Sequence, residues 1–192
     1  MIRESIITTL SEAGAAHVAP MGVTWREGVP VLAPFRPSST LDNLLARRCA
    51  VINHTDDVRV FAGCLTGRRD WQTRPADEVD GVVLQGALSH QEIEVERIED
   101  DPVRPRFVCR VVHEASHAPF RGFNRAQAAV IEAAILVSRL HMLPPEKIER
   151  EMAYLEIAVG KTAGSREREA WDWLAAAVEA FRRGGGPAER TA

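Results

Sequence analysis

Residues 34–44, Pro-Phe-Arg-Pro-Ser-Ser-Thr-Leu-Asp-Asn-Leu, combine the residue types and spacing that can hold a phosphate group. An apolar run at residues 29–33 leads into them, and two prolines then end that strand because proline cannot donate to a β-ladder. Ser38, Ser39 and Thr40 are each suited to cap a helix, whose leucines follow at helical spacing. The stretch therefore predicts a strand, a corner and a helix N-terminus.

The helix N-terminus and Arg36 supply the chemistry of this corner. The first backbone N–H groups of a helix lack intrahelical acceptors and carry partial positive charge, so they can bind a phosphate. Arg36 lies just before the cap and can add a forked pair of charge-assisted hydrogen bonds. The hypothesis is a phosphate-binding corner, although an ordinary capped helix after a strand gives the same local pattern.

Two further stretches have residue types that can contact a ligand. Pro20-Met21-Gly22 interrupts a strand pattern, which marks either an edge-strand kink or a place where the backbone approaches another group. Asn124, followed by Arg125, is a suitable N-cap for a later helix. Capping alone explains Asn124 as well as a ligand contact does.

The elements that position these residues are mostly β in the first part of the chain. Residues 4–10, 16–25 and 29–33 are strand-prone, and so are residues 50–53, 81–98 and 106–112. Asp56 or Asp57 is expected to cap a short helix, and residues 63–80 are expected to be irregular. Long strands in hairpins with few crossover helices predict a small antiparallel barrel.

The pattern becomes helical after Pro119, with predicted helices at residues 125–142, 146–159 and 165–181 and Ser165 as the cap of the last. We therefore divide the chain into three parts. Residues 1–118 form the barrel, residues 119–183 form a helical region packed on it, and residues 184–192 form a disordered tail.

Composition excludes several classes of protein. A net charge of −3 gives no reason to expect nucleic acid or an anionic membrane as a partner. The sequence has neither a signal peptide nor an apolar run of the ~18 residues that a membrane span needs, so we expect a cytoplasmic protein. The three cysteines are far apart, so neither a disulfide framework nor a structural zinc site is indicated.

One motif resembles that of a metalloenzyme. His113-Glu114-Ala115-Ser116-His117 fits the H-E-x-x-H pattern, which binds zinc when both histidines lie on one face of a helix. Here the pattern follows an alternating strand and closely precedes Pro119, so a helix has almost no room. We therefore expect no metal ligand, and no residue stands out as a catalytic acid or base.

Taken together, three N-terminal stretches resemble the flavin-reductase-like FMN-binding split barrels and, more narrowly, the domain-of-unknown-function family 447. They are residues 17–23 (His-Val-Ala-Pro-Met-Gly-Val), residues 36–44 and residues 51–57 (Val-Ile-Asn-His-Thr-Asp-Asp). Residues 121–135 and 161–164 are similar to the C-terminal helical region of that family. The resemblance covers nearly the whole chain and favours the phosphate-binding corner over a plain helix cap.

The resemblance implies an α+β fold, with a six-stranded antiparallel split β-barrel and a C-terminal helical region. It also implies a homodimer with FMN near the subunit interface. The implied phosphate-binding residues are Arg36, Ser38, Ser39 and Thr40, with Asn43 at the phosphate or ribityl chain. The backbone of Met21, Gly22 and Val23 is implied to run along the isoalloxazine ring. Asn124 and Arg125, of the same or of the partner subunit, are implied to complete the site.

The resemblance supports flavin binding far better than it supports any substrate, because function depends on the site and not on the fold. The expected function is an FMN-binding flavoprotein that acts as an oxidoreductase or electron carrier. A link to one-carbon or pterin metabolism is an association of the family. The alternative is a non-enzymatic module that binds flavin, deazaflavin or haem.

Overall fold

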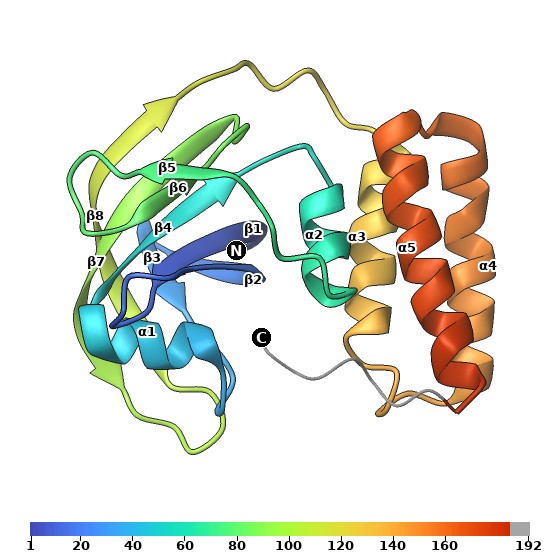
Figure 1. Cartoon of the computed structure of the whole chain (residues 1–192), viewed down its shortest axis with the longest axis horizontal. Coiled ribbons are helices and arrows are strands. Elements are labelled where there is room, and N and C mark those ends of the chain that lie inside the picture. Colours follow the sequence, from blue (N-terminus) through green and yellow to red (C-terminus); the bar gives the residue numbers. More distant parts are fainter. Residues whose placement is uncertain (185–192) are drawn as a thin grey trace. The chain divides into compact units, whose positions relative to one another are not determined.

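The computed structural model describes residues 1–184, and the chain divides into two compact units (Figure 1). Of the described residues, the barrel unit comprises Met1–Thr55 and Asp70–Phe120, and the helical unit comprises Asp56–Arg69 and Arg121–Gly184. Each unit is described by itself. The tail predicted at residues 184–192 lies outside the described residues from residue 185 on.

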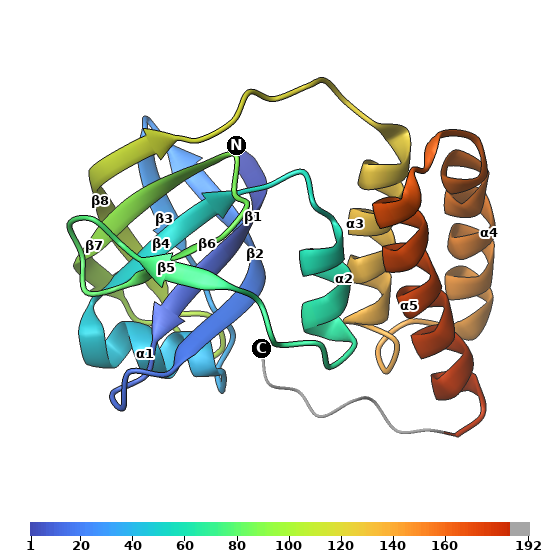
Figure 2. The same ribbon diagram turned by 45° about the horizontal axis from the view of Figure 1, so that its top comes forward.

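Six antiparallel strands close into a barrel in the order β1-β2-β3-β8-β7-β4, as Figure 2 shows from a second direction. They are β1 (Ile2–Leu10), β2 (Ala16–Arg26), β3 (Val29–Leu32), β4 (Cys49–His54), β7 (Ser89–Glu99) and β8 (Arg106–Ser116). The pairing of β1 with β4, with Ile7 opposite Ile52, closes the barrel. The predicted fold class, a six-stranded antiparallel barrel with a helical C-terminal region, is confirmed.

The barrel interior is filled by apolar side chains from alternate strand positions, because successive residues of a strand face opposite sides of the sheet. Ile7, Val23, Ile93 and Phe107 are all fully buried there. The helix α1 (Ser39–Arg47) contacts β1 and β2 and adds apolar side chains to the same core. This packing fixes the helix whose N-terminus forms the predicted corner.

A small two-stranded sheet, β5 (Thr73–Pro75) with β6 (Val82–Leu84), lies beside the barrel, and β6 contacts β1 and β4 (Figures 1 and 2). This small sheet shows that two of the predictions for residues 63–98 are wrong. Residues 81–98 are not one strand, because Gly86 adopts φ +86° in a left-handed turn that separates β6 from β7. Residues 63–80 are not wholly irregular, because they contain β5.

The helical unit consists of α2 (Arg59–Leu65), α3 (Arg125–Val137), α4 (Pro145–Thr162) and α5 (Ser165–Arg182). Alanines of α3 pack around Trp171 and Leu174 of α5, and Val58 and Ala62 at α2 belong to the same core. Several boundaries differ from prediction, and α4 continues to Thr162, beyond the predicted end at residue 159. The first long helix ends at Val137, and the N-cap of α5 is Gly164, whose N–H donates to the Glu167 carboxylate at 2.9 Å.

Among the described residues, no helix is both long enough and apolar enough to cross a membrane.

Candidate functional site

The corner after β3 has the predicted form, a capped helix N-terminus. Ser38 is the N-cap of α1, and its Oγ accepts a hydrogen bond from the Leu41 N–H at 3.2 Å. The Ser38 carbonyl accepts from the Asp42 N–H at 3.1 Å. The N–H groups of Ser39 and Thr40 have no acceptor within residues 1–184, so they are the donors that this terminus offers to an anion.

Arg36 lies at the surface beside these donors in the sequence. Its backbone N–H donates to the Val103 carbonyl at 2.9 Å, which anchors the residue, while its side chain is 45% exposed. The guanidinium lies 3.6 Å from a carboxylate oxygen of Asp100, which is itself 90% exposed. An ion pair this long and exposed contributes little, so the guanidinium can turn to a bound anion at small cost.

Thr40 and Asn43 differ from Arg36 because both are buried. Asn43 Nδ2 donates to Thr9 Oγ1 at 2.8 Å, a bond that ties α1 to β1. Thr40 Oγ1 is buried and has no hydrogen-bond partner among the described residues. A buried unpaired hydroxyl destabilises a protein, so Thr40 is the one polar group of the corner that gains most from a ligand oxygen.

Met21, Gly22 and Val23 lie on β2, opposite Ser5, Glu4 and Arg3 of β1. The Val23 side chain is in the barrel core, and Met21 packs partly against it. A Cβ on Gly22 would lie 3.0 Å from Ile2 Cγ2 and 3.2 Å from Glu4 Oε1. Crowding by these two side chains therefore gives the glycine a reason within the barrel, separate from any ligand.

The corner and the β2 stretch belong to the same barrel unit but are not adjacent. Thr9, the partner of Asn43, pairs with His17 across β1 and β2. Met21 is four residues further along β2, about 13 Å at the usual rise of a strand. A ligand that contacts both must therefore be elongated, as a nucleotide-like flavin with its phosphate at one end is.

Asn124 and Arg125 belong to the helical unit. Asn124 caps α3 by accepting from the Ala126 N–H at 2.8 Å, and its Nδ2 donates to the Thr162 carbonyl at 3.0 Å. Both ends of its amide therefore have structural partners. Arg125 is exposed. A ligand contact by either residue stays a prediction.

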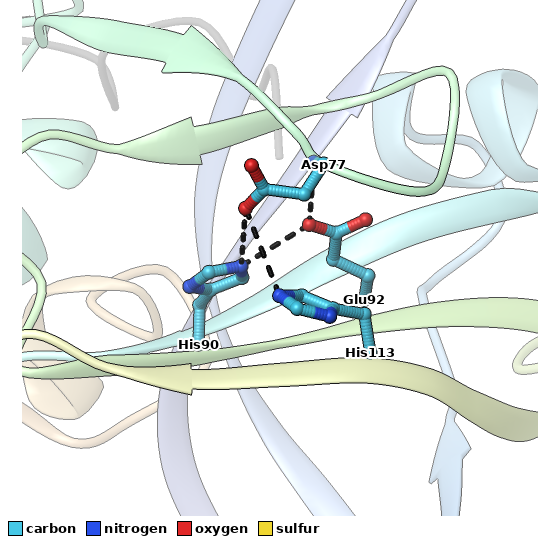
Figure 3. Close-up of side chains that lie close together, drawn as sticks. All are labelled: Asp77, His90, Glu92 and His113. Atoms are coloured by element: carbon cyan, nitrogen blue, oxygen red, sulfur yellow. Dashed lines mark hydrogen bonds and ion pairs between the residues drawn. The ribbon is translucent and has the colours of Figure 1, made fainter.

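A second polar cluster, which the sequence analysis missed, lies on the barrel unit around Glu92 (Figure 3). Glu92 is fully buried, and its carboxylate accepts hydrogen bonds from the backbone N–H groups of Asp77, Glu78 and Val79 at 2.7, 2.7 and 2.9 Å. Burial alone raises the pKa of Glu92, but these backbone hydrogen bonds, with a smaller contribution from the neighbouring His90, outweigh it and hold that pKa at about 2. The carboxylate is therefore ionised at neutral pH.

Three histidines lie close together at this cluster, and one of them, His90, contacts the Glu92 carboxylate. His90 is fully buried, and its ring lies between those of His113 and His117, at centroid distances of 5.7 and 5.0 Å. Burial lowers the pKa of His90, so its ring is neutral at neutral pH. One signal in the sequence could have indicated this cluster. His90 and Glu92 are two residues apart in a strand, so their side chains lie on the same face of the sheet.

The H-E-x-x-H pattern does not form a zinc-protease site. His113 and Glu114 do not lie on a helix but in the strand β8, which extends to Ser116, beyond the strand predicted at residues 106–112. Glu114 pairs with Gln91 and accepts a hydrogen bond from its side chain at 3.1 Å, whereas His113 pairs with Glu92. Adjacent residues of a strand face opposite sides, so Glu114 is turned away from the histidine that it would have to serve.

This barrel, closed by six antiparallel strands and carrying a capped helix N-terminus after β3, is of the split-barrel type. Residues 3–118 match the family described as "Protein of unknown function (DUF447) N-terminal domain", and residues 124–176 match its companion, "Protein of unknown function (DUF447)". The chain belongs to the DUF447 family. No curated protein sequence matches it.

Solved structures with the same fold include an FMN-bound DUF447 protein from Methanosarcina mazei, with TM-score 0.79 and 21% identity over 92% of this chain and 94% of that one. A 2-nitrobenzoate 2-nitroreductase from Pseudomonas fluorescens has TM-score 0.53 and 19% identity, covering 59% of this chain and 64% of that one. An NADH:FAD oxidoreductase from Streptomyces globisporus has TM-score 0.52 and 11% identity, covering 62% and 79%. At these identities the likeness is one of fold.

Proposed function

We propose that this protein is an FMN-binding flavoprotein that serves as an oxidoreductase or electron carrier. The observation that carries the proposal is the corner at α1, where an exposed Arg36 precedes two helix N–H groups that lack acceptors within the described residues. The FMN-bound family member from Methanosarcina mazei supports the choice of FMN among phosphate-bearing ligands.

The residues of the corner fit a flavin phosphate. Arg36 and the N–H groups of Ser39 and Thr40 supply positive charge and donors, and the Ser39 hydroxyl adds another. The buried Thr40 hydroxyl has an unmet hydrogen bond that a ligand oxygen can satisfy. Asn43 positions the helix through Thr9, and the backbone from Met21 to Val23 is the proposed wall for the ring.

When bound, the flavin supplies the redox chemistry, while the chain binds it, orients it and excludes water. No described side chain near the corner has the geometry of a catalytic acid or base. His54, the histidine closest in sequence, contacts Ser5 and Gln91 at 3.4 Å each, and burial lowers its pKa. The substrate class, including a pterin-like one-carbon carrier, therefore rests on the family association.

A homodimer with the flavin near the interface is part of the proposal. Phe35 and Leu45, on either side of the corner in sequence, are 55% and 47% exposed, and Ile2 on β1 is 64% exposed. We infer that a second chain covers exposed apolar side chains of this kind, as interfaces commonly do. A molar mass near twice that of one chain, measured by light scattering during gel filtration, supports the dimer, and a monomer at micromolar concentration contradicts it.

The test of flavin binding is direct. The purified protein is examined by visible absorption, any released cofactor is identified by mass, and cofactor-free protein is titrated with FMN. We expect a flavin spectrum and one FMN per chain. A colourless protein that takes up no FMN overturns the proposal, and a Soret band instead points to haem.

A second step separates an enzyme from a binding module. The FMN-loaded protein is mixed anaerobically with NADH or NADPH, and bleaching of the flavin band is followed. Bleaching supports a reductase. A flavin that neither nicotinamide reduces and that no acceptor reoxidises favours the non-enzymatic alternative, while an absorbance and mass typical of deazaflavin corrects the cofactor.

A further inference from the structure

The cluster around Glu92 brings four potential metal ligands together from three separate segments, as Figure 3 shows. His90 and Glu92 come from β7, His113 comes from β8, and Asp77 comes from the turn between β5 and β6. One ligand atom of each residue lies within 4.8 Å of all the others. None of these residues belongs to the corner proposed for FMN.

The carboxylate of Glu92 is held in place but still has room for another partner. Its Oε2 accepts the N–H groups of Glu78 and Val79, and its Oε1 accepts that of Asp77. A carboxylate oxygen has two lone pairs, so the second lone pair of Oε1 remains available. That oxygen lies 3.2 Å from His90 Nε2.

Contacts on the far side of the His90 ring decide which of its nitrogens carries the proton. His90 Nδ1 lies 2.8 Å from His117 Nε2, and Arg74 Nη2 lies 3.4 Å from that same nitrogen. A guanidinium can only donate, so in the tautomer that accepts from Arg74 the His117 Nε2 carries no hydrogen. We therefore assign the proton to His90 Nδ1, which donates to His117.

This assignment leaves a bare nitrogen facing the carboxylate. With the ring proton on Nδ1, the Nε2 of His90 presents a lone pair to Glu92 Oε1. Asp77 Oδ2 lies 4.0 Å from the same Nε2 and 3.7 Å from His113 Nε2. Arg74 Nη1 is 3.6 Å from that oxygen, outside hydrogen-bond range. Lone pairs that converge in this way repel each other unless a cation lies among them.

We propose that Asp77 Oδ2, His90 Nε2, Glu92 Oε1 and His113 Nε2 bind one divalent transition-metal ion, with zinc as the fitting case. Two imidazoles and two carboxylates are typical zinc ligands, at about 2.0–2.2 Å from the metal. Tetrahedral ligands at that distance are about 3.4 Å apart, geometry that follows from the bond length. The three separations of 3.2, 3.7 and 4.0 Å bracket that value.

The surroundings have the features of a protein metal site. A metal-bound histidine usually donates its other ring N–H to a fixed acceptor, as His90 does to His117. His90 and Glu92 are fully buried, while the Asp77 and His113 side chains are 53% and 33% exposed, which gives an ion a path inward. By binding residues of all three segments, the ion would hold the turn that carries Asp77 against β7 and β8. Its role would therefore be structural.

The experiment measures zinc binding by the full chain. Protein treated with a chelator is titrated with zinc by calorimetry, and thermal unfolding is recorded with and without the metal. We expect one zinc per chain and a rise in Tm of about 5 °C or more when free zinc is about 100 times the Kd. Cobalt replaces zinc in a parallel sample, whose visible bands report nitrogen and oxygen ligands.

Two ligand variants and one matched control assign the site. Asp77→Asn and His113→Ala alter partly exposed side chains and should fold, and each should weaken zinc binding by about 100-fold or more. Glu114→Gln removes a carboxylate next to His113 that faces the other side of the sheet, and it should bind zinc as the wild type does. Circular dichroism confirms that each variant is folded.

Two results overturn the proposal. One is folded wild-type protein that takes up no zinc and shows no cobalt bands. The other is binding that Asp77→Asn and His113→Ala leave unchanged. Uptake of FMN by the chelator-treated protein is measured separately, so failure of the metal site and failure of the flavin proposal are distinguishable.

Discussion

At the residue scale, the corner at α1 divides into an exposed part and a buried part. Arg36 and the N–H groups of Ser39 and Thr40 are the proposed donors to a ligand, whereas the hydroxyls of Ser38 and Thr40 are buried. Ser38 Oγ already accepts a hydrogen bond from the Leu41 N–H, so the role of this hydroxyl is to cap the helix. Substitutions at Arg36 and Thr40 therefore test different features of the same proposal.

Arg36→Ala should weaken FMN binding about 10- to 150-fold, because a charge-assisted contact contributes about 1.5–3 kcal/mol. Riboflavin has no phosphate, so its affinity should barely change. Fluorescence titration with both ligands measures the difference. Arg125→Ala is the matched control with the smaller expected effect, and an equal loss of riboflavin and FMN affinity in Arg36→Ala contradicts the phosphate assignment.

Thr40→Val should act in opposite directions on stability and on binding. Valine keeps the shape and removes a buried hydroxyl that has no partner in the described structure, so the ligand-free protein should keep or gain stability, by up to about 1 kcal/mol. FMN affinity should fall about 2- to 10-fold, the effect of a neutral hydrogen bond. Urea unfolding and FMN titration measure the two effects, and unaltered FMN affinity removes Thr40 from the site.

At the scale of elements, the ion pair between Asp57 and Arg59 stabilises the start of α2. The Asp57 carboxylate accepts hydrogen bonds from Arg59, including one of 2.6 Å from Nη2, and Arg59 also contacts Glu169 of α5 at 3.2 Å. Burial raises the pKa of Asp57, but the hydrogen bonds and charge of Arg59, together with Arg166, outweigh it and lower that pKa.

Asp57→Asn should therefore lower stability at neutral pH and have little effect in acid. A carboxylate whose pKa is lower in the folded state stabilises the protein above its unfolded pKa, about 3.9, and this contribution is lost as the pH falls through the folded pKa. We expect about 1 kcal/mol at pH 7, measured by urea unfolding across the pH range. Asp56→Asn makes the same charge change at the preceding residue and is the matched control.

Most elements follow from local sequence signals. Residues 38–40 predicted the α1 cap, and β-branched runs with turns predicted the hairpins, because these signals act over a few residues. The break at Gly86 was missed, since an alternating pattern runs across it and only pairing with β5 separates β6 from β7. The site around Glu92 was missed because Asp77 joins it only through the fold.

At the scale of the whole molecule, the two units are interleaved along the chain. The helical unit takes residues 56–69 from between two barrel strands, and α2 packs with α3 and α5. Val58 and Ala62 are almost fully buried in that helical core. The sequence analysis divided the chain after residues 118 and 183 and so placed residues 56–69 in the barrel part.

A fragment that ends at residue 118 should therefore aggregate, because α2 loses the helices that bury its apolar face. The matched control is the same fragment with residues 56–69 replaced by a glycine-serine linker of equal length, which should stay in solution. Gel filtration and binding of an apolar dye compare the two. If the first fragment is as soluble and as free of dye as the second, the packing of α2 is not needed to protect its surface.

The interleaving also has an evolutionary meaning. The chain passes between the units after Thr55, after Arg69 and after Phe120, so the helical unit is not a module attached at one end. Joining a ready-made helical bundle to the end of an ancestral barrel gene would not produce this arrangement, since one helix had to arise inside the barrel sequence. Recombination that exchanges the C-terminal helices between distant relatives should thus be rare unless the α2 segment is exchanged together with them.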